Sequence, residues 1–263
     1  MGATYTELLD LARTVAVEAA GLVRERRRGG VEVADTKSSS VDIVTEVDTA
    51  AEELIYSRLM GARPEDGFLG EEGASSESTS GVTWIVDPID GTVNFLYGIP
   101  QYSVSIAASV DDQVVAGVVV NVESGQVYAA TRGGGATCDG APLAVRDRVP
   151  LAHRLVVTGF SYLAEVRALQ ARAVSALLTE VRDIRRHGSA ALDLCGVGAG
   201  RADAYVEEGL NPWDAAAGGL VATEAGARLE TYPGVGGRDC IVCAPEDGFD
   251  ELLALVRQCG FFA

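Results

Sequence analysis

The chain has 263 residues, 48% of them hydrophobic, which is enough for one large domain or two small ones with a substantial core. No stretch approaches the roughly 20 consecutive apolar residues that a membrane helix needs. The 38 acidic residues outnumber the 21 basic ones, and the net charge of −17 argues against a nucleic-acid partner and against contact with an anionic membrane.

The first half of the chain reads as helices followed by a meander. Residues 1–28 have an amphipathic helix pattern, with acidic residues early and basic ones late, as the helix dipole favours. This start lacks the pattern of a secretory signal, so we expect a cytoplasmic protein. A polar loop with a short strand at 43–45 leads to a second amphipathic helix at 49–60. An antiparallel meander is then predicted, with strands at 102–110, 113–122 and 125–132.

The second half alternates between strands and helices. Strands are expected at 154–160, 182–186, 202–207 and 240–244, and helices at 162–181, 188–200, 211–226 and 247–260. Such alternation is typical of the α/β class. We therefore expect two subdomains, 1–150 and 151–263, with a ligand cleft between them.

The five cysteines form an odd and irregular set. Cys240 and Cys243 do have the C-x-x-C spacing of redox and zinc sites. A zinc site would need a second ligand pair, and none is present. Because Ile241 and Val242 between them are typical of a buried strand, we interpret both as core cysteines.

The stretch "WIVDPIDGTVNF" (84–95) places two acids three residues apart after an apolar strand. Residues Asp87 and Asp90 cannot share one face of a regular strand, because side chains alternate with a period of two. They can converge if the chain turns directly after Asp87, which Pro88 and Gly91 favour. Two carboxylates so close repel each other unless a cation lies between them. The haloacid-dehalogenase phosphatases carry a similar D-x-D-G-T, but that motif is one residue shorter.

Two further acids lie in distinctive settings. Glu71 belongs to "GEEG", which follows an apolar segment. Asp214 belongs to "NPWDAAAGG", where Asn211 is expected to cap a helix and Pro212 to begin it. Taken alone, Asp214 would be an acid that complements the helix dipole, and Glu71 a solvated loop acid.

These segments together resemble the signatures of the inositol monophosphatase family. "GEEG", "WIVDPIDGTVNF" and "GLNPWDAAAGGLVATEAGARL" occur in the order and spacing of that family. "KSSSVDIVTEVD" and "GSAALDLCGVGAGRADAYVE" extend the resemblance over nearly the whole chain. It implies an α/β fold layered as an αβαβα sandwich, a homodimer, and a metal-dependent, lithium-sensitive phosphatase that hydrolyses inositol monophosphate.

The resemblance also implies a set of metal ligands. Glu71, Asp87 and the Ile89 carbonyl would hold a first Mg²⁺, while Asp87, Asp90 and Asp214 would hold a second. A third, weaker ion would share Glu71. Mn²⁺ would substitute for Mg²⁺, whereas Li⁺ and Ca²⁺ would inhibit. All of these ligands are hard oxygen atoms, which Mg²⁺ prefers.

The remaining roles follow from the same resemblance. Asp48 and Thr92 would orient and activate the attacking water, with Glu71 beside them and Thr45 in support. The substrate would be bound by Asp90, Gly91, Thr92, Gly188, Ser189, Ala190 and Glu207. Without the resemblance, Glu207 would be interpreted as an edge-strand acid. Lys37 lies on a segment that resembles a loop over the metals.

Alternative functions stay open at this point. Relatives with the same core hydrolyse fructose 1,6-bisphosphate, histidinol phosphate or nucleotide 3′-phosphates, and Asn211 and Pro212 vary within the family. An alternative of another class is a non-catalytic, divalent-ion-binding regulatory protein. The intact pair of Asp48 and Thr92 argues against it, because a protein that only binds ions has no need to activate water.

Overall fold

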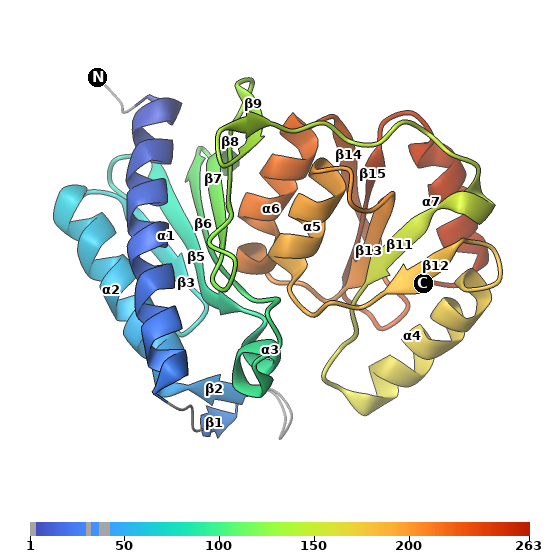
Figure 1. The fold of residues 1–263 in the computed structure, drawn as a ribbon, viewed down its shortest axis with the longest axis horizontal. Coiled ribbons are helices and arrows are strands. Elements are labelled where there is room, and N and C mark those ends of the chain that lie inside the picture. Colours follow the sequence, from blue (N-terminus) through green and yellow to red (C-terminus); the bar gives the residue numbers. More distant parts are fainter. Residues whose placement is uncertain (1–3, 30–32, 37–42) are drawn as a thin grey trace.

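Helices and sheets lie in alternating layers in the computed structural model, which describes residues 4–29, 33–36 and 43–263 (Figure 1). The helices are α1 (Tyr5–Arg28), α2 (Glu46–Ala62), α3 (Thr92–Tyr97), α4 (Ala164–Leu177), α5 (Ala190–Gly198), α6 (Pro212–Glu224) and α7 (Phe249–Gln258), with a 3-10 turn at Leu151–His153. The strands are β1 (Val33–Thr36), β2 (Ile43–Thr45), β3 (Gly67–Gly70), β4 (Ser75–Ser76), β5 (Val82–Asp90), β6 (Ser103–Val110), β7 (Gln113–Asn121), β8 (Val127–Thr131), β9 (Gly135–Cys138), β10 (Ala141–Pro142), β11 (Leu155–Thr158), β12 (Asp183–Arg185), β13 (Ala204–Glu208), β14 (Ala227–Pro233) and β15 (Asp239–Pro245).

Two sheets with helices on both faces produce five layers. The larger sheet has the strand order β10-β9-β8-β7-β6-β5-β3-β4, and the smaller one has the order β12-β11-β13-β15-β14. Helices α1 and α2 cover one face of the larger sheet, α5 and α6 lie between the sheets, and α4 and α7 cover the far face of the smaller sheet (Figure 1). This arrangement confirms the predicted αβαβα sandwich.

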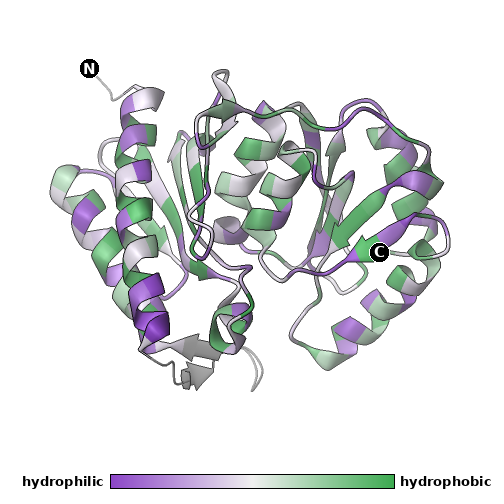
Figure 2. Ribbon diagram, viewed as in Figure 1, coloured by the Kyte–Doolittle hydropathy of each residue, from purple (hydrophilic) through white to green (hydrophobic). Residues whose placement is uncertain are grey.

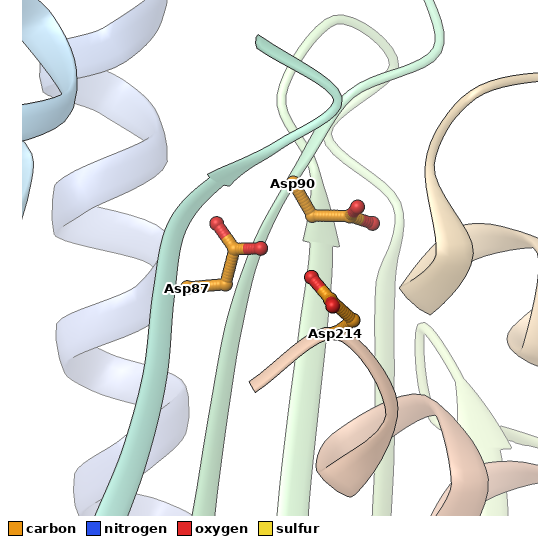
Figure 3. A group of neighbouring side chains, drawn as sticks. All are labelled: Asp87, Asp90 and Asp214. Carbon is orange, nitrogen blue, oxygen red and sulfur yellow. The ribbon is translucent and has the colours of Figure 1, made fainter. Parts of the chain in front are cut away.

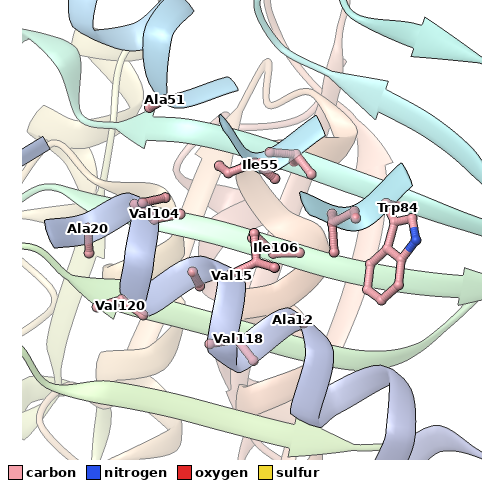
Figure 4. Packing of buried hydrophobic residues seen from close by; sticks show 14 of the residues in the cluster. Ala12, Val15, Ala20, Ala51, Ile55, Trp84, Val104, Ile106, Val118 and Val120 are labelled. Carbon is pink, nitrogen blue, oxygen red and sulfur yellow. The ribbon is translucent and has the colours of Figure 1, made fainter. Parts of the chain in front are cut away.

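Side chains alternate between the two faces of each strand, so neighbouring residues of one strand belong to different layers of the core. In β15, Val242 packs with α4 and α7, while the adjacent Cys243 packs with α5 and α6. Because both sides of α5 and α6 are covered, these helices are mostly apolar or neutral (Figure 2). On the other side of the larger sheet, Val15 of α1 and Ile55 of α2 pack on Val104 and Ile106 of β6 (Figure 4).

The two cysteines with C-x-x-C spacing are core residues, as predicted. Both are buried and neither forms a disulfide. Cys240 faces the layer of α4 and α7, and Cys243 faces the layer of α5 and α6. Since the thiols lie on opposite faces of β15, they cannot act together on one metal ion or one substrate.

The larger sheet contains the predicted meander. Strands β6, β7 and β8 pair antiparallel, and Asp111 and Asp112 adopt positive φ in the turn between β6 and β7. The sheet is nevertheless mixed, because β3 pairs parallel with β5. Strands β1, β3, β4, β9 and β10 were not expected from the sequence pattern; each is only two to four residues long.

The expected turn directly after Asp87 does not form. Strand β5 continues to Asp90, but its pairing with β6 shifts: Asp87 lies opposite Ser105 and Asp90 lies opposite Ser103. Three residues of β5 therefore advance against two of β6, which is a bulge. The extra residue cancels the odd spacing, so that two acids three residues apart can face the same side of the strand.

The smaller sheet is mixed as well. Strands β11, β12 and β13 pair in parallel, as strand–helix alternation suggests, whereas β15 pairs antiparallel with both β13 and β14. Strand β14 was missed in the sequence, because "ARLETYP" is half polar. The division at residue 150 stays a prediction, since α5 and α6 from the second half also pack on the larger sheet. In the described part of the chain, each helix is too short or too polar to cross a membrane.

Candidate active site

Three acids from two distant segments meet beside the end of β5. Asp87 and Asp90 come from the bulged strand, and Asp214 comes from the first turn of α6 (Figure 3). Each offers a carboxylate oxygen, and these oxygens lie within 4.8 Å of one another. Asp87 and Asp90 are buried, and Asp214 is partly buried. The donor set is therefore all oxygen and suits a hard cation such as Mg²⁺.

Burial, together with the proximity of these acids, makes their ionised forms unfavourable in the metal-free protein. Burial raises the pKa of Asp87 well above its usual range, and the charges of Glu71, Asp90 and Asp214 add to that rise. Burial raises the pKa of Asp90 to about 7. Asp214 shows the same upward direction of its pKa, first from burial and then from Asp90. A divalent cation between the carboxylates would relieve this repulsion, so the residues fit a bound metal.

Asp90 is oriented by the start of α5. Its carboxylate accepts hydrogen bonds from the Ala191 amide at 2.9 Å and the Ala190 amide at 3.2 Å, and from the Ser189 hydroxyl. Ser189 is also the N-cap of α5, because its side chain accepts a hydrogen bond from the Leu192 amide. The start of a helix favours a negative charge, so this placement stabilises Asp90 as a carboxylate.

Asp214 occupies the position that the sequence predicts. Asn211 caps α6, Pro212 begins it, and a carboxylate oxygen of Asp214 accepts a hydrogen bond from the Asn211 amide at 2.6 Å. The carboxyl group thus completes a capping box with one oxygen. It also lies in the three-acid cluster, so the two interpretations of Asp214 are compatible.

Glu71 lies next to this cluster. It follows β3, its amide donates to the Val86 carbonyl at 3.1 Å, and its charge acts on Asp87. Asp87 is also held locally, since its carboxylate accepts a hydrogen bond from the Ile89 amide at 3.0 Å. The Ile89 side chain is buried in the core between α1, α2 and the larger sheet.

Asp48 and Thr92 are in direct contact. The Thr92 hydroxyl lies 3.1 Å from an Asp48 carboxylate oxygen and 3.1 Å from the Ile89 carbonyl. Asp48 is fully buried in the first turn of α2, where it also accepts hydrogen bonds from the amide and hydroxyl of Thr45. Thr45 is the N-cap of α2 and forms a capping box with Asp48.

A pocket of about 430 Å³ contains nearly all of the site residues inferred from the sequence. Its lining includes Glu71, Asp87, Ile89, Asp90, Gly91, Thr92, Gly188, Ser189, Ala190, Glu207 and Asp214. Asp48 is not part of the lining and reaches it through Thr92. Lys37 lies outside the described residues.

Glu207 lies on β13 with its side chain directed into the same pocket. Its carboxylate accepts a hydrogen bond from the Tyr205 hydroxyl at 2.7 Å. Burial raises the pKa of Glu207 to about 7. A Cβ at Gly159 would lie 2.0 Å from Glu207 Oε2, so a glycine at this position leaves room for the carboxyl group.

Sequence reasoning missed two arginine side chains that line the pocket. Arg186 precedes the Gly188 loop, and Arg238 lies between β14 and β15, where its guanidinium donates to the Asn211 side chain at 2.8 Å. The position of Arg186 two residues before Gly188 could have indicated it. Nothing near Arg238 in the sequence resembles a site motif, and only the packing of the smaller sheet brings it to the pocket.

The fold and the acidic site together define a class of protein. The model of the "Inositol monophosphatase family" matches residues 4–260, and the chain belongs to this family. It is 44% identical to "Inositol-1-monophosphatase SuhB" of Mycobacterium tuberculosis, over 95% of this chain and 93% of that protein. The solved structure of Mycobacterium tuberculosis SuhB covers 98% of both chains at 43% identity, with a TM-score of 0.85.

More distant relatives carry two different names. "Inositol monophosphatase 1" of Sus scrofa is 37% identical, over 89% of this chain and 87% of that protein. "Nus factor SuhB" of Vibrio cholerae is 35% identical, over 96% of this chain and 97% of that protein. The match to each spans most of both chains.

Proposed function

We propose that this chain is a Mg²⁺-dependent phosphomonoesterase that hydrolyses inositol monophosphate to inositol and phosphate. The convergence of Asp87, Asp90 and Asp214 in the pocket that also contains Glu207 carries this proposal. The family, and the relatives named for inositol monophosphate, support the choice of substrate.

The metal ligands in this proposal are those that the family resemblance implied. Glu71, Asp87 and the Ile89 carbonyl would hold one Mg²⁺, and Asp87, Asp90 and Asp214 would hold another, while a third, weaker ion would share Glu71. Mn²⁺ substitutes, and Li⁺ and Ca²⁺ inhibit. When bound, such cations supply Lewis-acid polarisation of the phosphate and activation of water. The raised pKa values of Asp87 and Asp214 in the metal-free protein support this ligand set.

The protein's own groups would then hold the water and move its proton. The Thr92 hydroxyl donates to Asp48, which leaves a lone pair on Thr92 Oγ1 free to accept a hydrogen bond from a water in the pocket. A proton taken from that water can pass through Thr92 Oγ1 to the buried Asp48 carboxylate. Asp48 stays oriented because Thr45 holds its other oxygen. This is general base catalysis with the hydroxyl as relay.

Other groups would bind the two ends of the substrate. Gly91 and Thr92 line the pocket where α3 begins. The first amides of a helix have no acceptor within the helix, so they would be available to donate hydrogen bonds to a phosphate. Glu207 would accept hydrogen bonds from vicinal hydroxyls, and Gly188, Ser189 and Ala190 line the same pocket. A cytoplasmic homodimer that binds neither nucleic acid nor membrane stays part of the prediction.

Phosphate release from a panel of esters tests the proposal. The panel contains inositol 1-phosphate, fructose 1,6-bisphosphate, histidinol phosphate and a nucleoside 3′-phosphate, each assayed with Mg²⁺ and with excess EDTA. We expect inositol phosphate to be hydrolysed best, only with Mg²⁺, and with inhibition by millimolar Li⁺. Full activity in EDTA would exclude the metal mechanism. Absence of turnover on every ester would favour the non-catalytic, ion-binding alternative.

A further inference from the structure

The loop that carries Glu71 is a short turn between β3 and β4. The Gly70 amide donates to the Ala74 carbonyl at 2.9 Å and closes the turn. The Glu71 amide donates to Val86 of β5 at 3.1 Å and ties the turn to the strand that carries Asp87. The amides of Glu72 and Ala74 donate to a side chain of α2 instead.

A buried carboxylate receives these two amides. Glu52 of α2 is 4% exposed, and its oxygens accept from the Glu72 amide at 2.8 Å and from the Ala74 amide at 2.9 Å. One carboxylate thus spans the turn and fixes the backbone that follows Glu71. Hydrogen bonds to an ionised acceptor are stronger than those between neutral groups.

The sequence leaves space for this contact. A Cβ at Gly70 would lie 2.3 Å from Glu52 Oε2 and 2.6 Å from its carboxyl carbon. The backbone of Gly70 does not adopt positive φ, so an alanine there would be opposed by the Glu52 carboxylate and the nearby Phe68 ring rather than by backbone strain. Gly70 is therefore part of the same contact.

Helix α2 connects this contact to the water-activating pair. Asp48 and Glu52 are four residues apart, so they lie on the same face of the helix. Both are buried: Asp48 contacts Thr92, and Glu52 contacts the turn at Glu71. One rigid helix face thus sets the positions of two parts of the pocket that come from different loops.

We infer that Glu52 is a positioning residue for Glu71. Glu52 lies outside the pocket, and by holding Glu71 in place it sets the affinity of the metal site for Mg²⁺. Glu52 does not line the pocket, and it acts through the backbone of residues 70–74. The inference rests on the proposed function, because it takes Glu71 as a metal ligand. Outer partners that orient metal ligands typically contribute about 10- to 100-fold to metal affinity.

Direct Mg²⁺ binding by titration calorimetry tests this role, together with the Mg²⁺ dependence of phosphate release. Glu52→Gln replaces one acceptor oxygen with a donor, and Gly70→Ala displaces the intact carboxylate. We expect each to weaken Mg²⁺ binding about 10-fold or more, while saturating Mg²⁺ restores most of kcat. The double variant should be little worse than either single variant, because both act on one contact.

Two control variants separate positioning from other effects. Glu52→Asp keeps the charge, but its shorter side chain withdraws the carboxylate from the Glu72 and Ala74 amides. It should therefore weaken Mg²⁺ binding as Glu52→Gln does. Asp66→Asn disturbs another buried carboxylate, which accepts from Trp84 Nε1 at 3.0 Å and from the Ser80 hydroxyl at 2.6 Å. It should lower the Tm and leave Mg²⁺ affinity unchanged.

The outcomes distinguish this inference from the proposed function. Unchanged Mg²⁺ affinity in Glu52→Gln and Gly70→Ala would overturn the positioning role, as would normal affinity in Glu52→Asp alone or an equal loss in Asp66→Asn. If Glu52→Gln fails to fold, Gly70→Ala and Glu52→Asp decide the result. Wild-type protein that neither binds Mg²⁺ nor needs it for turnover would instead refute the proposed function.

Discussion

The Thr92 hydroxyl lies 3.1 Å from the Asp48 carboxylate, although 44 residues separate them in the chain. Thr92 begins α3 directly after the bulged strand β5, and Asp48 lies in the first turn of α2. The contact therefore joins the segment with two acids of the cluster to a helix on the outer face of the larger sheet. In the proposed function, this contact is the path for a proton from the pocket to a buried carboxylate.

Removing the Thr92 hydroxyl should reduce catalysis without removing metal binding. Positioned proton transfer typically contributes about 10²- to 10⁴-fold to a rate. Thr92→Val keeps the shape and should lower kcat by about that factor, whereas Thr92→Ser keeps the hydroxyl and should retain most of the activity. Single-turnover rates at saturating Mg²⁺ measure the difference. Equal kcat in Thr92→Val and wild type would exclude the relay.

Replacing the central acid should abolish turnover and stabilise the metal-free protein. Burial raises the pKa of Asp87, and the charges of Glu71, Asp90 and Asp214 repel its ionised form and raise it further. Asp87→Asn removes that repulsion while the side-chain oxygen can still accept from the Ile89 amide. The Tm without metal should rise, by about 2–4 °C for each kcal/mol at this chain length. Near-normal turnover in the variant would contradict the bridging role of Asp87.

Glu207 should govern alcohol specificity rather than the chemical step. Losing a hydrogen bond to a charged group costs about 1.5–3 kcal/mol, or roughly one to two orders of magnitude. Glu207→Gln should lower kcat/KM for inositol phosphate by that amount and leave an aryl phosphate almost unaffected. Tyr205→Phe removes the Tyr205 hydroxyl that donates to Glu207 and serves as a milder matched variant. An equal loss on both substrates would mean that Glu207 supports the metals or the fold.

The stability of the metal-free protein should depend on pH through Asp90. Its folded pKa, about 7, lies above the usual value of 3.8, so the folded state binds the proton more tightly than the unfolded state. The resulting stabilisation is complete below about pH 4 and is lost as pH rises to about 7.

Thermal melts in EDTA between pH 4.5 and 7.5 measure this effect. Relative to wild type, Asp90→Asn should gain Tm progressively as pH rises, because Asn stays neutral. Saturating Mg²⁺ should remove this pH dependence from the wild type, since the bound cation favours the ionised form. A Tm difference between variant and wild type that is constant over this range would show that Asp90 is already ionised in the folded protein at low pH.

Local sequence determined much of this protein. The cap of α6, the apolar periods of the helices and the meander follow from neighbouring residues, so Asn211 and Pro212 could be placed before any contact was known. The acids of the site could be identified because family motifs are contiguous in the chain. The role of each acid still rests on the resemblance.

Only the tertiary structure decided how these segments meet. A bulge, not a turn, brings Asp87 and Asp90 to one side, because pairing with β6 sets the register of β5. Strand β15 pairs antiparallel with β13, and β14 forms at the edge of the sheet by pairing with β15. Both features depend on pairing between strands, which the sequence of a single strand does not specify. Arg238 and Glu52 carry no local signal, because the Asn211 side chain that Arg238 contacts and the Glu72 amide that Glu52 accepts from lie 20 or more residues away in the chain. Such contacts depend on the packing of whole layers, whereas caps and periods depend on residues within one or two turns.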